Sequence, residues 1–244
     1  MANDGFYDFK AQAFPILQKH GFPATVYLTT YYCERSQPVF QLACHYLFWK
    51  KQGVTIPSDS NFEWDLDLRD PEACHRTLRK ILAACEKRGA SGAEKNALLE
   101  RIAHRLKVDY EGFLSSRIVQ LLSPSETAQL AARGVDFQLH THRHRTPLDR
   151  SLFRAEIEDN RKRLEAITGT IPKHFCYPSG VVEPDFLPWL KELGVESATT
   201  CTHGLAQPSS APLLLPRLVD VSGLAQAEFE SWVSGVRAFF PSRN

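Results

Sequence analysis

The chain has 244 residues, 43% of them hydrophobic, a length that suits one large domain or one domain with an insertion. Its 29 basic and 28 acidic side chains leave a formal net charge of +1, and no basic stripe with interleaved aromatic residues is present, so nothing indicates a nucleic-acid partner. No apolar run approaches the roughly 20 residues that cross a bilayer, and no charged segment followed by an apolar one opens the sequence, so we expect no signal peptide.

Six cysteines are scattered along the chain, and none forms a Cys-x-x-Cys pair. In a chain this long, scattered cysteines are more often buried thiols than disulfides. Reduced thiols favour a cytoplasmic location, which is our expectation from the sequence. The six are Cys33, Cys44, Cys74, Cys85, Cys176 and Cys201.

The first elements are a helix followed by a strand. Residues 7–20 have apolar side chains at helical spacing, and Gly21 follows as a stop. The β-branched run at 24–30 lies between chain breakers and predicts a buried strand. A helix followed by a buried strand is typical of an α/β fold.

The next hundred residues have a different pattern, with helical periodicity and little strand. The helical patterns cover 39–51, 71–89, 93–108 and 124–134. We interpret residues 1–244 as a single domain in which the first three patterns form a helical insertion at about 38–125.

Strand and helix then alternate again, as in an α/β barrel. Strands are expected at 135–139, 173–178, 195–200 and 216–221, and helices at 151–168, 183–194 and 225–240.

Three histidines lie close together where the strand at 135–139 ends, in the segment "DFQLHTHRHRTPLDR". In α/β barrels, side chains at the carboxyl ends of strands point into the mouth of the active site. His140 and His144 are four residues apart, so both imidazoles can face one point if a helical turn follows the strand. Two such imidazoles suit zinc, with bonds of about 2.0–2.1 Å, and a third ligand would have to come from elsewhere.

The same segment also fits a solvated polar loop. Arg143 and Arg145 flank His144, and their positive charges would repel a cation. From the histidine cluster alone, a metal site and a histidine-rich surface loop remain open.

Further motifs follow one another along the chain. "NDGFYDF" at 3–9 places Asp-Gly before the first helix, and His140-Thr141-His142-Arg143-His144 follows a strand. "HFCYPSG" occupies 174–180, and "LPRLVDV" occupies 215–221. In this order they resemble the polysaccharide deacetylase family, also called the NodB homology domain, which includes carbohydrate esterases. The resemblance implies a deformed (β/α) barrel.

The resemblance also implies a set of metal ligands. The family's second motif aspartate corresponds to Asp4, and its two motif histidines correspond to His140 and His144. These three would bind one divalent metal, most simply Zn²⁺, and leave a position open for water. The ion would polarise an amide carbonyl and lower the pKa of its bound water.

Other positions take family roles by the same resemblance. The backbone N–H of Ser179 would stabilise the oxyanion, and Tyr177 and Pro178 would form a wall of the sugar site. Arg217 would contact substrate or pair with a carboxylate. His203 is the nearest candidate for the general acid, because the final strand carries no histidine.

The sequence departs from the family pattern at the general base. The base aspartate of the family corresponds to Asn3, whose amide cannot accept a proton from water near neutral pH. The arginine that orients this base in many members corresponds to Cys176. The strand before the motif is expected to be missing, since the sequence starts at Met1. A shortened chain is our preferred explanation, over non-native first residues or a degenerate homologue.

Three functions are consistent with the sequence. The first is a metal-dependent hydrolase that removes N-acetyl groups from the amino sugars of a polysaccharide or oligosaccharide. The second is an amidase of the same family acting on a small amide, with the insertion covering the site. The third is a catalytically impaired homologue that binds metal or sugar. The sequence indicates no oligomeric state.

Overall fold

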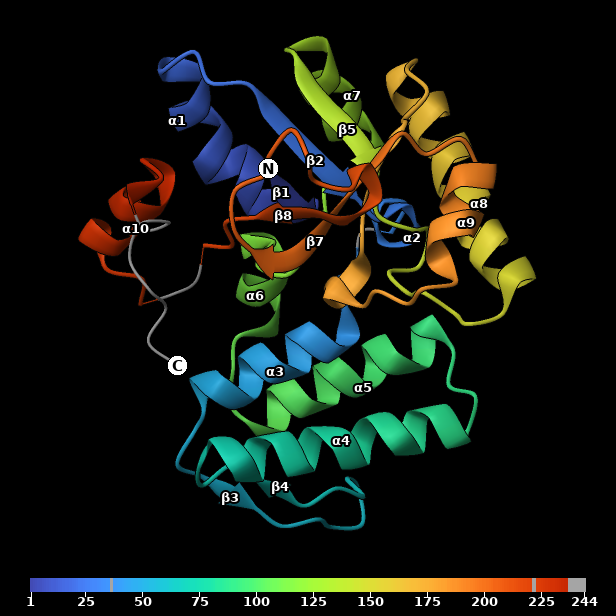
Figure 1. Ribbon diagram of the computed structural model, residues 1–244. Coiled ribbons are helices and arrows are strands. Elements are labelled where there is room, and N and C mark those ends of the chain that lie inside the picture. Colours follow the sequence, from blue (N-terminus) through green and yellow to red (C-terminus); the bar gives the residue numbers. More distant parts are fainter. Residues whose placement is uncertain (36, 221–222, 237–244) are drawn as a thin grey trace. The chain divides into compact units, whose positions relative to one another are not determined.

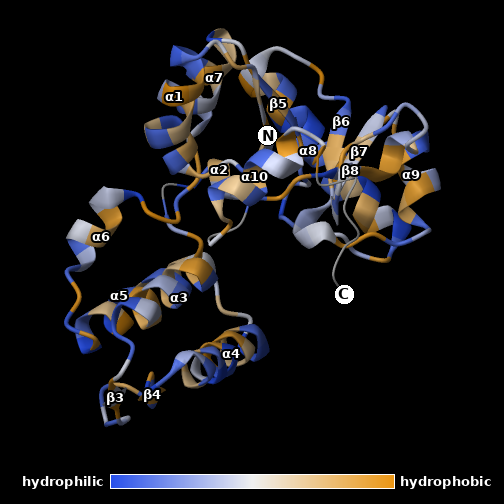
Figure 2. Cartoon of the chain, turned by 60° about the vertical axis from the view of Figure 1, so that its left-hand side comes forward, coloured by the Kyte–Doolittle hydropathy of each residue, from blue (hydrophilic) through white to orange (hydrophobic). Residues whose placement is uncertain are grey.

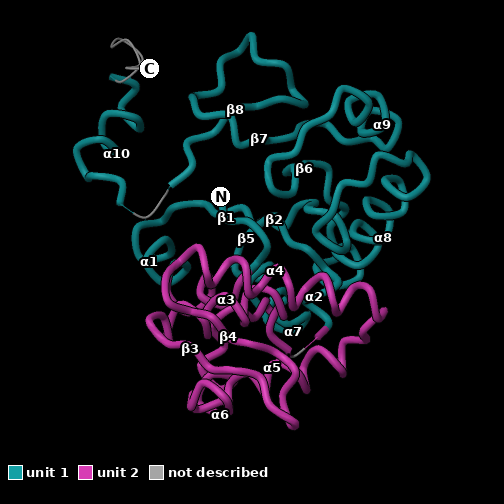
Figure 3. Tube along the Cα trace, turned by 90° about the horizontal axis from the view of Figure 1, so that it is seen from below, with its two compact units in different colours: residues 1–5, 13–34, 123–244 teal, residues 6–12, 35–122 magenta. Residues whose placement is uncertain are grey.

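A computed structural model describes residues 1–35, 37–220 and 223–236 of the chain (Figure 1). The chain divides into two compact units (Figure 3). The first comprises residues 1–5, 13–34 and 123–244, and the second comprises residues 6–12 and 35–122. Each unit is described by itself below.

The first unit is built on a six-stranded sheet in the order β1-β2-β5-β6-β7-β8, and all neighbouring strands are parallel. Parallel strands with helical connections confirm the predicted α/β class. The strands are β1 (Ala2–Asp4), β2 (Ala24–Leu28), β5 (Val135–Leu139), β6 (His174–Cys176), β7 (Ser197–His203) and β8 (Leu215–Arg217).

The sheet is strongly curled. In a flat sheet of six strands the two edge strands would lie roughly 24 Å apart, at about 4.8 Å per strand. Here the guanidinium of Arg217 on edge strand β8 donates a 2.8 Å hydrogen bond to the side-chain oxygen of Asn3 on edge strand β1. The strands therefore form a partly closed barrel, as predicted.

The first strand is present, contrary to our expectation. Residues 2–4 pair in parallel with Val26, Tyr27 and Leu28 of β2. The edge of β2 offers unpaired backbone N–H and C=O groups, and even a three-residue segment that reaches this edge satisfies some of them. β1 is short, but it places Asn3 and Asp4 beside the buried strands.

Local sequence signals explain where helices of the first unit begin and end. α8 (Arg150–Thr168) begins at Asp149, whose carboxylate accepts a hydrogen bond from the N–H of Leu152, and ends at Gly169 with φ of 72°. α7 (Pro124–Ala132) begins with a reciprocal capping box between Ser123 and Glu126. The remaining helices are α1 (Phe14–Lys19), α2 (Thr30–Cys33), α9 (Phe186–Glu192) and α10 (Gln226–Val233), with 3₁₀ turns at Pro178–Gly180 and Pro212–Leu214.

The helix expected at 7–20 is divided in the structure. A π-helical turn, Phe9–Ala13, precedes α1, because Pro15 has no backbone N–H to donate within a longer helix. The helix expected at 225–240 corresponds to α10, which ends at Val233. Residues 237–240 of the expected helix lie outside the described residues.

The second unit is mainly helical and has its own core (Figure 2). In Figure 2 hydrophobic and hydrophilic residues both occur along α4, as expected for a helix with one buried face. Sequence analysis missed its short hairpin and α6. The elements are α3 (Phe40–Lys50), β3 (Thr55–Ile56), β4 (Leu66–Asp67), α4 (Pro71–Lys87), α5 (Gly92–Arg105) and α6 (Tyr110–Ser116).

None of the described helices combines the length and the apolar character that a membrane span requires. All six cysteines have free thiols in the structure.

Candidate metal centre

Asp4, His140 and His144 converge at the carboxyl ends of β1 and β5. Their ligand atoms all lie within 4.8 Å of one another. The Asp4 carboxylate oxygen Oδ1 is 3.4 Å from Nε2 of His140 and 2.9 Å from Nε2 of His144. Two ligands bonded at about 2.05 Å to one tetrahedral Zn²⁺ would be roughly 3.3 Å apart. The three donors therefore have the spacing and the chemistry to hold a divalent metal.

The orientation of His140 is set by its other ring nitrogen. Nδ1 lies 2.7 Å from the backbone carbonyl oxygen of Cys176, and this acceptor requires Nδ1 to carry the proton. The lone pair of Nε2 in the neutral ring then faces Asp4 and His144. A ring fixed in this way by a carbonyl is the usual arrangement of a metal-binding histidine.

Four of the non-glycine residues with left-handed backbone belong to the loops at this edge of the sheet: Asp4 (φ 63°), Thr141 (φ 62°), His144 (φ 55°) and Ser179 (φ 55°). Such conformations cost about 1–3 kcal/mol each and persist where the surroundings enforce them. Gly5, with φ of 83°, continues the turn after Asp4. The turns that present the two motif loops are therefore held by tertiary contacts.

The charges of the cluster are strongly coupled. Burial alone would raise the pKa of the Asp4 carboxyl, but its hydrogen bonds with His140 and His144 and their positive charges hold that pKa well below its ordinary value. Burial would lower the pKa of His140, yet Asp4 and the Cys176 thiol raise it to about 9. At neutral pH a proton on Nε2 of His140 would therefore compete with a metal for this position.

The histidine-rich segment is not a solvated surface loop. His140 and His142 are 1% and 5% exposed. His142 lies between the two candidate ligands but points elsewhere: its Nδ1 is 2.9 Å from the hydroxyl of Thr30, and its ring meets that of Tyr31 edge-on. His142 therefore anchors the loop to α2.

The loop at 174–180 gives its residues different positions. Tyr177 is only 1% exposed, its hydroxyl donates to the carbonyl of Leu213, and burial raises its pKa to about 12. Its side chain lies in the core rather than at a surface that a sugar could touch. Pro178 is buried, and Ser179 is exposed. At Gly180 a Cβ would lie 2.8 Å from the side chain of Cys201, so glycine is required.

Asn3 lies among neutral and cationic groups. Its side-chain oxygen accepts the hydrogen bond from Arg217 and lies 3.7 Å from the thiol sulfur of Cys176. Arg217 is 9% exposed, and its second terminal nitrogen is 3.3 Å from the sulfur of Cys201. Arg217 thus contacts the residue at the position expected for the general base, and among the described residues its guanidinium forms no ion pair with a carboxylate.

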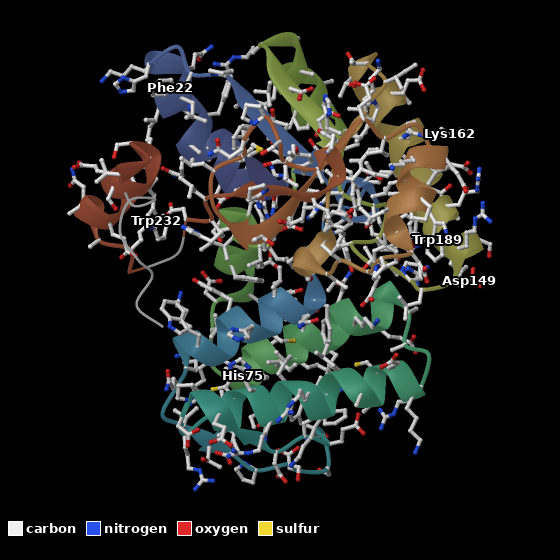
Figure 4. The ribbon with its side chains drawn as sticks, viewed as in Figure 1. Phe22, His75, Asp149, Lys162, Trp189 and Trp232 are labelled. Carbon is white, nitrogen blue, oxygen red and sulfur yellow. The ribbon has the colours of Figure 1, made fainter. Side chains whose placement is uncertain are left out.

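His203 ends β7, where it is the register partner of Arg217 on β8. Its ring meets that of Trp232 on α10, with centroids 4.0 Å apart; Figure 4 labels Trp232 on that helix. The imidazole is exposed, and among the described groups of possible ligands it does not join the Asp4 cluster.

Sequence analysis missed two buried polar residues on α8. Glu156 and Asn160 are 1% and 0% exposed and are four positions apart, so they share one face of the helix. The amide oxygen of Asn160 accepts from the N–H of His140, and its nitrogen donates to the carbonyl of Leu28. The sequence signal that could have identified both residues was the presence of polar side chains at core positions of an amphipathic helix.

Comparison with known proteins agrees with this architecture. Residues 93–198 match the family described as polysaccharide deacetylase, a segment that includes His140 and His144. No curated protein sequence matches the chain.

Two solved structures share the fold. The deacetylase PplD of Streptococcus pyogenes, solved in complex with acetate, has a TM-score of 0.56 and 14% identity, over 95% of this chain and 68% of that one. IcaB from Ammonifex degensii has a TM-score of 0.51 and 14% identity, over 96% of this chain and 69% of that one. At this identity the likeness concerns the fold. The family match over residues 93–198, together with the sequence motifs, agrees with the predicted resemblance of this chain to the polysaccharide deacetylase family.

Proposed function

We propose that this protein is a metal-dependent hydrolase that removes N-acetyl groups from the amino sugars of a polysaccharide or oligosaccharide. The observation that carries the proposal is the convergence of Asp4, His140 and His144 within 4.8 Å at the carboxyl edge of a parallel barrel. This edge is where barrels of parallel strands place their active sites. The match of residues 93–198 to the polysaccharide deacetylase family supports the substrate class.

One carboxylate and two imidazoles are the donor set of a catalytic zinc site, so Zn²⁺ is the ion we propose. A divalent ion held there supplies Lewis-acid polarisation of the acetyl carbonyl and acidification of water. The role of the three side chains is to hold the ion and leave one side open to substrate. His140 contributes its Nε2 lone pair because Cys176 fixes the proton on Nδ1.

Neighbouring groups complete the proposed site. The backbone N–H of Ser179, on an exposed left-handed turn, would donate to the oxyanion that develops from the acetyl carbonyl. Pro178 supports this turn from the buried side. His203 is our candidate for the donor of a proton to the leaving amine, since its strand register places it beside Arg217. Arg217 orients the side chain at position 3.

A second candidate is a homologue that binds metal or sugar and turns over slowly. Asn3 favours it, because its amide oxygen already accepts a hydrogen bond from Arg217 and an amide is not a base near neutral pH. Among the described residues, Asp4 is the one acidic side chain in ion-pair contact with His140 or His144, and it is occupied as a ligand.

Acetate release from N-acetylglucosamine oligomers tests both candidates. The assay compares the unsubstituted protein, Asn3→Asp and Asn3→Asp/His140→Ala/His144→Ala, each with Zn²⁺ and with a chelator. The hydrolase proposal expects acetate release by the unsubstituted protein, faster in Asn3→Asp, that requires both histidines and the ion. Release that survives loss of the histidines would contradict it. Release by Asn3→Asp with none above background from the unsubstituted protein would favour the second candidate.

A further inference from the structure

The buried carboxylate of Glu156 contacts the segment that carries His144. One of its oxygens accepts from the backbone N–H of Arg143 at 2.8 Å. The other accepts from the guanidinium groups of Arg143 at 3.1 Å and Arg145 at 2.6 Å. Glu156 is 1% exposed, and a buried carboxylate persists only when it is paired in this way. Its partners are the two residues on either side of His144.

The backbone of this segment needs such support. Thr141 and His144 both have left-handed φ values, which non-glycine residues adopt only under constraint. The backbone carbonyl of Glu156 accepts from the N–H of His142 at 3.0 Å, and the Thr141 hydroxyl accepts from the N–H of Arg145 at 3.1 Å. Glu156 thus contacts the segment through its backbone and its side chain, before and after His144.

Glu156 also compensates the positive charges of the two arginines beside His144, which would otherwise repel a cation. Both guanidinium groups are paired with its carboxylate, and Arg143 also lies 3.8 Å from Asp159. The pairing draws the positive charges toward α8 and away from the imidazole of His144, which faces Asp4.

We propose that Glu156 is a positioning residue of the metal centre: by holding Arg143 and Arg145, it fixes the left-handed turn that brings Nε2 of His144 to Asp4. The inference rests on the proposed metal site. It assigns to α8, which supplies none of the proposed ligands, the task of shaping the site.

The test is Zn²⁺ affinity, measured by competition with a chelating dye, of the unsubstituted protein and Glu156→Gln. The glutamine has nearly the same shape, but whichever way its amide turns, its NH₂ faces an N–H donor of Arg143 or Arg145. Residues that orient metal ligands typically change affinity by about 10–100-fold, so we expect a loss of that size. Saturating Zn²⁺ should still load one equivalent, because Asp4, His140 and His144 remain.

The matched control is Glu158→Gln, two positions away on α8. Its carboxylate is 51% exposed and pairs with Arg154, four residues before it. We expect its Zn²⁺ affinity to stay within about twofold of the unsubstituted protein, as for a surface pair. Circular dichroism of each metal-free variant, recorded below its melting temperature, confirms that affinity is compared between folded proteins.

A second variant covers the case in which Glu156→Gln does not fold. Arg145→Gln removes a half-exposed cation. If charge alone mattered, metal binding would tighten; if the contact positions His144, binding weakens, which is our expectation. Unchanged affinity in Glu156→Gln, or tighter binding in Arg145→Gln, overturns the inference while the metal site stands. No Zn²⁺ binding by the unsubstituted protein would overturn the metal site and this inference together.

Discussion

Arg217 and Asn3 join the two edge strands of the sheet through one hydrogen bond of 2.8 Å. Arg217 is nearly buried, and the hydrogen bonds of its guanidinium on the described part of the chain go to the amide oxygen of Asn3 and the sulfur of Cys201. A buried guanidinium is most stable beside a carboxylate. Position 3 is therefore a place where an aspartate would be charge-paired with Arg217.

Asn3→Asp should raise deacetylase turnover by about 10²–10⁴-fold, the usual contribution of a general base. The new carboxylate would pair with Arg217, which would keep it ionised at neutral pH. The measurement is acetate release from N-acetylglucosamine oligomers. Asn3→Ser is the control, since serine can accept the hydrogen bond but is no base, and it should leave the rate low. Equal rates for the two variants would show that another residue supplies the base.

His140→Ala and His144→Ala should each reduce bound zinc, and the double substitution should remove it. A carboxylate with one imidazole is a weaker and less specific site than three ligands. Elemental analysis of purified protein measures the metal-to-protein ratio. His104→Ala is a suitable control, because its side chain is 71% exposed on α5. Similar zinc content in the double variant and the control would refute the ligand assignment.

Zinc affinity should increase with pH from about 6.5 to 9. Asp4 and the Cys176 thiol raise the pKa of His140 from 6.5 to about 9, so below about pH 9 a proton occupies the nitrogen that would bind the metal. Deprotonating one ligand predicts a gain of about tenfold per pH unit, which should level off above pH 9. Competition titrations at several pH values measure it. An affinity that does not vary over this interval would be inconsistent with a protonated His140 in the metal-free protein.

Gly5→Ala should lower the free energy of unfolding by about 2–5 kcal/mol, because a left-handed alanine costs about 1–2 kcal/mol and an overpacked core about 1–3 kcal/mol. A Cβ at Gly5 would lie 2.1 Å from the Leu28 side chain, and φ at this position is 83°. The control is Gly21→Ala, where φ is 68° and no atom lies within 4 Å of the added carbon. Urea unfolding should show a clearly smaller loss for the control; equal losses would mean that the contact with Leu28 is relieved without cost.

Several features could be predicted from the sequence because their causes are local. The four-residue spacing of His140 and His144 after an apolar strand indicated a shared ligand point, and the structure places their ring centroids 5.0 Å apart. Gly169 marked the end of α8, because glycine adopts the left-handed conformation that closes a helix. The alternation of strands and helices indicated the parallel barrel.

Other features depend on residues far apart in the sequence, and only the tertiary structure decided them. Local propensity does not reveal that residues 2–4 find the open edge of β2, or that Tyr177 points into the core. The curl of the sheet brings Arg217 to Asn3, across 214 positions of the chain. Glu156 becomes a partner of the His144 loop because α8 packs on that loop. Sequence determined which chemical groups are present and their order; packing decided which of them meet, because buried charges and amides must find partners that spacing along the chain does not specify.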